Sequence, residues 1–267
     1  MKYEQFRDSI AQYLQSHPQG VTWPELKDRL GLPQRTACYT WVYRMEEDVG
    51  LLRERSPKGM VWRVPTGKEM ASRTPDRTND ARVLGGNLAP FPLPIRTRRM
   101  ILRAPALSDV EGVRSALDDS EMSQYVPHRP YPYARQDAID FVRVSRRKMR
   151  KGEFLNLVGV DRTSGELRVA VGVHSIDWRD LRGEIGYWVP RKHWGNGFAT
   201  EAVVAVCKEV FRSLPIRRIE ATVLAENIPS GRVLAHAGFV KEGTRRQATL
   251  RGSSWRDVDI YGLLKDD

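Results

Sequence analysis

The chain has 267 residues and a formal net charge of +11, with 40% apolar and 29% charged residues. This mixture is typical of a soluble globular protein and excludes a chain that is disordered throughout. No stretch is apolar and long enough to cross a bilayer, and the first ten residues lack the apolar core of a signal peptide. We therefore expect a cytoplasmic protein without membrane contact.

The length favours two domains, and the positive charge is spread along the chain. Residues 1–65 carry 10 Lys and Arg against 8 Asp and Glu, residues 66–100 carry 7 against 3, and residues 101–267 carry 27 against 22. A nucleic-acid-binding module usually concentrates its basic residues, so the nearly balanced first segment disfavours strong DNA binding. The excess still suits an anionic partner, such as a phosphorylated cofactor or an RNA-rich particle.

The first 65 residues have the pattern of a small helical domain that ends in a hairpin. Thr22-Trp-Pro-Glu25 has the form of a capping box with an early proline, which predicts the start of a helix. Three helices are predicted over residues 4–16, 22–30 and 34–48, and two short strands over residues 51–55 and 60–64. This order predicts a winged-helix-like domain over residues 1–65.

Residues 66–95 are rich in Gly, Pro, Asn and charged side chains, and such a composition predicts a linker. From residue 96 onward helical and alternating patterns mix, and Ser108-Asp-Val-Glu111 resembles a second capping box. Helices are predicted over residues 108–117, 136–151, 198–213 and 229–237, and strands over residues 99–103, 155–161, 168–176, 184–189, 219–225, 245–250 and 258–264. Residues 96–267 are therefore expected to form an α+β domain whose central sheet is mixed, mostly antiparallel and flanked by helices.

The most informative segment is Trp194-Gly-Asn-Gly-Phe-Ala-Thr-Glu201, which follows a predicted strand and opens a predicted helix. Its two glycines allow a sharp turn and a close approach of the backbone to a ligand. The first N–H groups of the helix have no partner in the helix and lie at its positive end, where they favour a phosphate. The pattern predicts a phosphate or pyrophosphate site, although a plain strand-to-helix turn would explain it equally well.

Several stretches occur together and in order with this loop. They are Glu184-Ile-Gly-Tyr-Trp-Val189, His193–Ala202, Asn227-Ile-Pro-Ser230, Ala237–Gly243 and Trp255–Val258 with Tyr261, preceded by the 99–103 strand and Ser108-Asp109. With these motifs residues 96–267 resemble the GNAT superfamily of N-acetyltransferases, and within it the RimJ/RimL-like group of ribosomal-protein acetyltransferases. The resemblance implies the GNAT fold and acetyl-CoA as the cosubstrate.

The resemblance also assigns residues to the cofactor. The loop amides would hold the pyrophosphate, the strand ending at Val189 would diverge from its neighbour and offer backbone groups to the pantetheine arm, and Asn227 would contact that arm. Trp194 stands where the superfamily has Gln or Arg, so the backbone rather than a side chain would grip the phosphates. The predicted cofactor-binding residues are Tyr187, Trp188, Val189, Trp194, Gly195, Asn196, Gly197, Phe198, Ala199, Thr200, Asn227 and Ser230.

Acetyl transfer needs a neutral amine, but an α-amine has a pKa of about 8 and a lysine of about 10.4. A base must therefore remove a proton, directly or through water, and Glu184 is the candidate; it also fits a solvated carboxylate or an ion-pair partner. Leu234 stands where many relatives have a general-acid tyrosine, so Ser230 is the candidate hydrogen-bond donor to the thiolate, unless it is a plain helix-start serine.

Other ionisable residues have simpler interpretations. His193 is expected to face solvent or the coenzyme, and Glu201 to complement the helix dipole. Cys207 is expected to be buried in packing, which favours direct attack by a primary amine in a ternary complex over a covalent acyl-enzyme. No His, Cys, Asp and Glu residues have metal-ligand spacing, so no metal is expected.

The predicted function is an acetyl-CoA-dependent N-acetyltransferase whose acceptor is a protein N-terminus or a small-molecule amine. The alternative is a DNA-binding transcription regulator whose GNAT-like domain senses acyl-CoA. The basic run Arg143–Lys151 fits either a solvated helix face or a docking surface for an acidic or RNA-containing partner. The sequence leaves open whether the N-terminal domain contacts nucleic acid. It also leaves open whether the protein is a monomer or a dimer.

Overall fold

The computed structural model divides the chain into two compact units. The N-terminal unit comprises Met1–Asn79 and His128–Pro130, and the C-terminal unit comprises Asp80–Pro127 and Tyr131–Asp267. The structure describes residues 3–32, 41, 42, 45, 48, 49, 51–57, 59–65, 91–126, 129–251 and 253–267.

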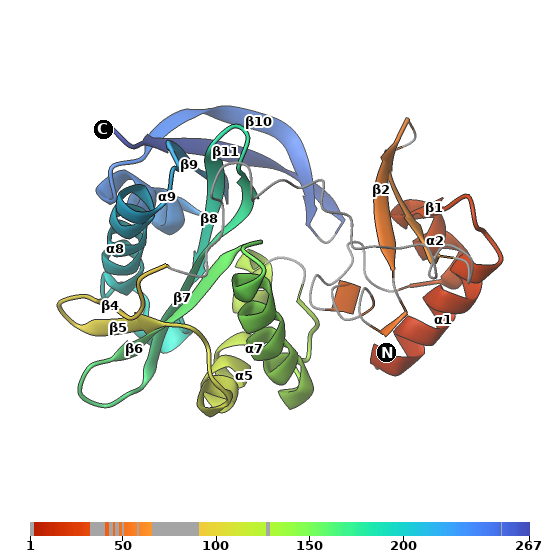
Figure 1. Ribbon diagram of the computed structural model, residues 1–267, viewed down its shortest axis with the longest axis horizontal. Helices are drawn as coiled ribbons and strands as arrows, with labels where there is room; N and C mark the ends of the chain where they lie inside the picture. The colour runs from red at the N-terminus through yellow and green to blue at the C-terminus, as the bar shows by residue number, and fades with distance from the viewer. Residues whose placement is uncertain are drawn as a thin grey trace. The chain divides into compact units, whose positions relative to one another are not determined.

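The N-terminal unit contains a three-stranded antiparallel sheet in the order β1-β3-β2 (Figure 1). Its elements are α1 Tyr3–Gln15, β1 Val21–Thr22, α2 Trp23–Leu30, β2 Leu52–Ser56 and β3 Gly59–Arg63. Phe6 and Leu14 of α1 share one buried core with Leu26 and Trp62. The predicted third helix, residues 34–48, lies largely outside the described residues, so the winged-helix-like assignment stays a prediction.

Helix α2 begins and ends as its sequence predicts. The Thr22 hydroxyl accepts the N–H of Glu25, and the Glu25 carboxylate accepts the N–H of Thr22 at 2.8 Å. This capping box satisfies two backbone donors that the helix itself leaves unpaired. Gly31 ends the helix with a φ of 57°, in the left-handed region that glycine adopts without strain.

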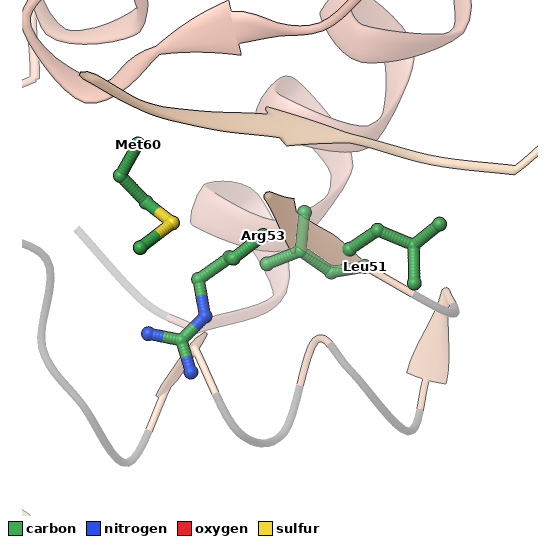
Figure 2. A pocket seen from close by; sticks show the side chains of 4 residues that line it. Leu51, Arg53 and Met60 are labelled. Atoms are coloured by element: carbon green, nitrogen blue, oxygen red, sulfur yellow. The ribbon is translucent and has the colours of Figure 1, made fainter. Parts of the chain in front are cut away.

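A shallow hollow of about 450 Å³ lies beside the β2–β3 hairpin. Figure 2 shows its lining, which consists of Leu51, Leu52, Arg53 and Met60. It contains none of the predicted site residues, because all of them belong to the C-terminal unit.

The C-terminal unit is built on an eight-stranded sheet in the order β10-β11-β9-β8-β7-β6-β5-β4 (Figure 1). The strands are β4 Ile95–Arg96, β5 Met100–Arg103, β6 Leu155–Asp161, β7 Leu167–Asp177, β8 Arg182–Trp188, β9 Arg218–Leu224, β10 Val240–Arg251 and β11 Ser254–Leu264. Every neighbouring pair is antiparallel except β8 and β9, which run parallel. This confirms the predicted mixed, mostly antiparallel sheet.

Helices cover both faces of this sheet. They are α5 Val110–Leu117, α6 Met122–Tyr125, α7 Arg135–Arg150, α8 Phe198–Ser213 and α9 Ile228–His236. On β7, Val169 and Val171 belong to the core that contains α8 and α9, whereas Ala170 belongs to the core that contains α5 and α7, because successive strand residues point to opposite faces. No helix in the described part of the chain is long and apolar enough to span a membrane.

The last residues of the predicted linker belong to the core of the C-terminal unit. Phe91 is 7% exposed and shares the core with Met100 and Val203, and Leu93 packs against the same core. Ile95 pairs with Leu102 in the antiparallel ladder between β4 and β5. Phe91, Leu93 and Ile95 alternate with Pro92 and Pro94, and prolines within such a run argue against a strand, which is why the sequence pattern did not indicate burial here.

The predicted capping box at Ser108 does not form. Instead the buried Asp109 carboxylate accepts the N–H of Ala106 at 2.7 Å and pairs with the Arg103 guanidinium at 2.7 and 2.8 Å. A 3-10 turn, Leu107–Asp109, therefore precedes α5. The ion pair to a neighbouring strand, which the local pattern does not reveal, decides how this helix begins.

Replacing Phe91 with Ala should destabilise the C-terminal unit by about 3 kcal/mol, because the change removes a buried ring and leaves a cavity. Urea unfolding followed by the fluorescence of the tryptophans measures this loss. Leu107→Ala is the matched control, since Leu107 is 65% exposed and its removal should change stability by at most about 0.5 kcal/mol. Equal stability of the two variants would show that residue 91 is still part of the linker.

Candidate active site

Strands β8 and β9 lie side by side for three residue pairs and then separate. The parallel pairing joins residues 182–184 to residues 218–220. Beyond it, β8 continues along β7 to Trp188, and β9 continues along β11 to Leu224. In the described sheet, the edge of residues 185–188 that faces β9 therefore has no partner strand. Free backbone groups between diverging strands suit an extended ligand that carries amides, and the predicted divergence of this strand is confirmed.

The loop after β8 turns into α8 through two glycines in the left-handed region. Gly195 has a φ of 72° and Gly197 a φ of 73°, where a side chain would be strained. The carbonyl of Gly197 accepts the N–H of Glu201 at 3.1 Å as the first hydrogen bond of the helix. No acceptor among the described residues meets the N–H groups of residues 198–200. These donors and the helix dipole favour an anion at this end of α8.

Arg99 holds this loop from the β4–β5 turn. Its backbone N–H and its Nε donate to the two carboxylate oxygens of Glu201 at 2.8 and 2.7 Å. Its Nη1 donates to the carbonyl of Asn196 at 2.8 Å, and its guanidinium lies 4.3 Å above the ring of Phe198. Burial would raise the pKa of Glu201, but a hydrogen bond with Thr97 and these contacts with Arg99 together hold the pKa below its usual range. Glu201 therefore anchors the loop as well as complementing the helix dipole.

The side chain of Trp194 lies against the end of β8. Its indole Nε1 donates to the carbonyl of Val189 at 2.8 Å. Its ring meets the edge of Tyr125 on α6 at a centroid distance of 6.0 Å, and an ion pair of 2.6 Å joins Arg191 to Glu121 beside it. The carbonyl of Val189 is thus already occupied, which leaves residues 185–188 as the free edge of β8.

His193 differs from its prediction. It is only 9% exposed, and its ring lies between Arg168, Glu166 and Phe198 rather than facing solvent or a coenzyme. Burial and the nearby Arg168 charge lower the pKa of His193. The ring of His193 therefore packs the loop onto the β6–β7 turn. Its partners Glu166 and Arg168 are more than twenty residues away in the sequence, which is why the sequence could not reveal that His193 is buried.

The opposite wall of the gap is the first turn of α9. Asn227 caps this helix, and its Oδ1 accepts the N–H of Ser230 at 3.2 Å. The Ser230 hydroxyl lies 2.8 Å from the hydroxyl of Tyr187, which crosses from β8. Burial raises the pKa of Tyr187 to about 12, so the phenol stays protonated. Leu234, in the place of a tyrosine found in many relatives, is fully buried.

Glu184 is the last β8 residue that pairs with β9, and it is partly exposed on the face opposite Tyr187. The imidazole of His174 on β7 lies beside it, with Nδ1 4.0 Å from a carboxylate oxygen of Glu184. Burial lowers the pKa of His174, and the negative charge of Glu184 partly offsets this effect. The mouth of the gap therefore has a carboxylate and an imidazole on one face and two hydroxyl groups on the other.

Comparisons with known proteins agree with this geometry. The acetyltransferase (GNAT) domain family matches residues 99–240. The uncharacterized N-acetyltransferase p20 of Bacillus licheniformis is 33% identical over 169 residues, which cover 63% of this chain and 94% of the relative. The chain belongs to the GNAT acetyltransferase family.

Other relatives place the chain within the family. The ribosomal-protein-serine acetyltransferase of Escherichia coli (strain K12) is 29% identical over 101 residues, or 38% of this chain and 56% of that protein. The structure of Mycobacterium smegmatis RimJ in complex with CoA-disulfide aligns with a TM-score of 0.57 at 25% identity, covering 62% of this chain and 82% of that one. The predicted RimJ/RimL-like kinship and the predicted enzyme class, an acetyl-CoA-dependent N-acetyltransferase, are confirmed.

The structure brings most of the predicted site residues of this GNAT enzyme to one gap. Glu184 and Tyr187 lie on β8 at its mouth, Ser230 and Asn227 form its α9 wall, and residues 194–200 close its end. Trp188 is different, because its ring packs against Phe141 in the core under α7, so only its backbone faces the gap.

Two further groups at the gap were missed by sequence reasoning. The Tyr187 hydroxyl was overlooked because its partner, Ser230, is 43 residues away. His174 lies opposite Glu184, but a register irregularity follows between His174 and Asp177. The sequence predicted strands over residues 168–176 and 184–189 but not the register between them, so it did not show that His174 and Glu184 face each other.

Cys207 is buried as predicted, at 3% exposure in the core around α8. Burial raises the pKa of its thiol to about 12, so it stays neutral and is a poor nucleophile. Among the residues that the structure describes, no group of three or more His, Cys, Asp or Glu is arranged to hold a metal ion.

Replacing Gly197 with Glu should lower the affinity for acetyl-CoA at least about 100-fold, because a carboxylate would enter the anion cradle of the loop. Isothermal titration calorimetry with acetyl-CoA measures the loss. Gly165→Glu is the matched control, since Gly165 has a φ of 72° and no atom within 4 Å of an added Cβ, so it suffers similar backbone strain away from the cradle. Unchanged affinity in a folded Gly197→Glu variant would remove the loop from the cofactor site.

Proposed function

We propose that this GNAT enzyme transfers the acetyl group of acetyl-CoA to a primary amine by direct attack in a ternary complex. The observation that carries this proposal is the gap between β8 and β9, which ends at the unpaired amides that open α8. A long ligand with amides at one end and phosphates at the other fits both features at once. The neutral, buried thiol of Cys207 favours direct attack over a covalent acyl-enzyme.

The cofactor would lie along the gap. The amides of residues 195–200 would hold the pyrophosphate, with Trp194 closing the loop from outside. The free backbone edge of residues 185–188 would pair with the amides of the pantetheine arm, which replaces the strand pairing that β9 no longer provides. Asn227 would meet the arm from the α9 side, where its position is fixed by the cap that it forms.

The leaving thiolate would be stabilised from the α9 wall. Ser230 would donate its hydroxyl hydrogen to the sulfur, and the protonated Tyr187 phenol, which donates to the Ser230 carbonyl at 3.0 Å and lies 2.8 Å from the Ser230 hydroxyl, would hold this serine in place. A hydroxyl fixed in this way can stabilise the negative charge that develops on the sulfur. This arrangement replaces the tyrosine that Leu234 excludes.

The incoming amine would approach from the opposite face of the sheet. It must lose a proton, because a primary amine with a pKa of about 8 to 10.4 is mostly charged near neutral pH. Glu184 lies at the mouth of the gap on that face, and we assign it to the removal of this proton, directly or through a neighbouring group.

We propose a protein N-terminus as the acceptor in preference to a small-molecule amine. The named relatives include a ribosomal-protein-serine acetyltransferase and two ribosomal protein uS5 alanine N-acetyltransferases. Arg143 and Arg150 on α7 and Lys151 directly after it are exposed, and they suit an acidic or RNA-containing particle that presents such a substrate. No observation favours the DNA-binding regulator.

Ser230→Ala should lower kcat by about 10²-fold or less, since one hydrogen bond to the leaving group is lost. Tyr187→Phe should lower kcat by a smaller factor, because it weakens the same hydrogen bond indirectly. Thiol release from acetyl-CoA in the presence of a panel of amines measures both. Ser213→Ala, at the far end of α8, is the control and should retain the wild-type rate. Wild-type turnover in Ser230→Ala would leave positioning alone to explain catalysis.

The N-terminal unit should be dispensable for the chemistry. A chain of residues 80–267, which keeps Phe91 and β4, should bind acetyl-CoA and acetylate a small free amine at the full-length rate. Because residues 1–65 carry little excess charge, the full chain should bind random duplex DNA weakly at about 0.15 M salt. Steady-state kinetics and DNA-binding titrations at several salt concentrations test both points. Tight, selective binding to one duplex would instead support the regulator.

A further inference from the structure

His174 and Glu184 face each other across the β7–β8 ladder. They are the last regular pair before an irregularity that extends to the Asp177–Arg182 pair. Ser175, the next residue, has a φ of 50°, a left-handed conformation that is uncommon for a residue with a side chain. Such irregularities re-aim side chains and are frequent next to active sites. Here the irregularity begins directly after the imidazole.

The second nitrogen of His174 lies over the mouth of the gap. A Cβ added to Gly186 would come within 3.2 Å of Nε2 and 3.8 Å of Cδ2, so the ring covers the Cα of Gly186. Gly186 is the second residue of β8 beyond the last pair with β9. The absence of a side chain there gives the imidazole its place beside the free edge of the strand.

Nε2 has no hydrogen-bond partner among the described residues, whereas Nδ1 has two polar neighbours. Nδ1 lies 3.3 Å from the Ser175 hydroxyl and 4.0 Å from a Glu184 carboxylate oxygen. A negative charge beside Nδ1 favours the tautomer that carries its hydrogen there. The lone pair of the neutral ring is then on Nε2 and points toward the space above Gly186.

We propose that His174 is the general base for the amine and that Glu184 is its positioning partner. This inference rests on the proposed acetyl transfer and names the group that receives the proton. Nε2 takes one proton from the charged amine, which frees the nitrogen lone pair to attack the acetyl carbon. The carbon–sulfur bond then breaks, and its electron pair leaves with the sulfur, which accepts a hydrogen bond from Ser230 and takes the second proton that the nitrogen loses as the amide forms. The imidazolium returns its proton to solvent, and coenzyme A is released.

The electrostatic surroundings suit this role. His174 is paired with Glu184 on β8, and the strand partner of Glu184 on β9 is Glu220, whose carboxylate is tied to Arg182 and Arg218. Burial lowers the pKa of His174, which favours the neutral ring that can accept a proton. An imidazole is also a stronger base than a typical carboxylate, with reference pKa values of about 6.5 and 4.3. Glu184 favours the imidazolium that forms during transfer.

The decisive experiment replaces His174 with Ala in the full chain. We expect kcat for amine-dependent thiol release to fall by about 10² to 10⁴-fold, with acetyl-CoA affinity unchanged by calorimetry. Added imidazole should restore part of the rate, which a purely structural histidine would not allow. His174→Gln should be equally slow, because its amide can form hydrogen bonds but cannot act as a base. This variant keeps a polar side chain at the position and so controls for a local folding defect in His174→Ala. His236→Ala, exposed at the end of α9, is the control and should keep the wild-type rate.

The pH dependence separates the two residues. Wild-type kcat should rise with pH through the pKa of His174, below about 6.5, and then level off, because the base must be neutral. In Glu184→Gln this limb should move to lower pH, because the charge that raises the His174 pKa is gone, and the plateau should fall less than in His174→Ala. A wild-type rate in His174→Ala, combined with lost activity in Glu184→Gln, would overturn the proposal and make the carboxylate the base. A wild-type enzyme that releases no coenzyme A with any amine would overturn the proposed function itself, and this inference with it.

Discussion

The separation of β8 from β9 is the constraint on which the whole site depends. β9 pairs along its full length with β11, and β8 pairs along its length with β7, so each strand follows a different neighbour once their shared ladder ends at Glu184 and Glu220. Unpaired backbone groups in the middle of a sheet need a ligand or water as their hydrogen-bond partner. The gap between β8 and β9 therefore suits a polar chain, with the β8–α8 loop at its end and α9 at its side.

The β8–α8 loop at the end of this gap is held by ion pairs that leave its backbone N–H groups free. Arg99 is engaged by Glu201 and by the carbonyl of Asn196, and Arg168 is engaged by Asp161 and Glu166. These cations therefore shape the loop rather than grip an anion directly. Trp194, in the position where the superfamily has Gln or Arg, is consistent with this division, because its indole closes onto Val189. Anion binding then rests on the backbone donors and the dipole of α8.

The two faces of the gap carry different chemical groups. Tyr187 and Ser230 meet on the α9 side, where hydroxyl donors suit a departing thiolate. His174 and Glu184 meet on the other side, where a neutral imidazole next to a carboxylate suits an amine that must lose a proton. Alternation along β8 causes this separation, because Glu184 and Tyr187 are three residues apart and so point to opposite faces. Proton removal and leaving-group stabilisation can then act on one thioester without the two sets of groups pairing with each other.

The sequence by itself determined the elements and the family. Apolar spacing predicted α8 at Phe198–Ser213, the Thr22 capping box predicted the start of α2, and the ordered motifs around Gly197 indicated an acetyltransferase. These features depend on residues a few positions apart, which the sequence displays directly. Tertiary structure alone decided that Phe91 is core, that His193 is buried, and that His174 faces Glu184. Arg99 meets Glu201 across 102 positions and Tyr187 meets Ser230 across 43. Such contacts follow from strand register and packing, and a one-residue slip in register would exchange the faces on which these side chains lie.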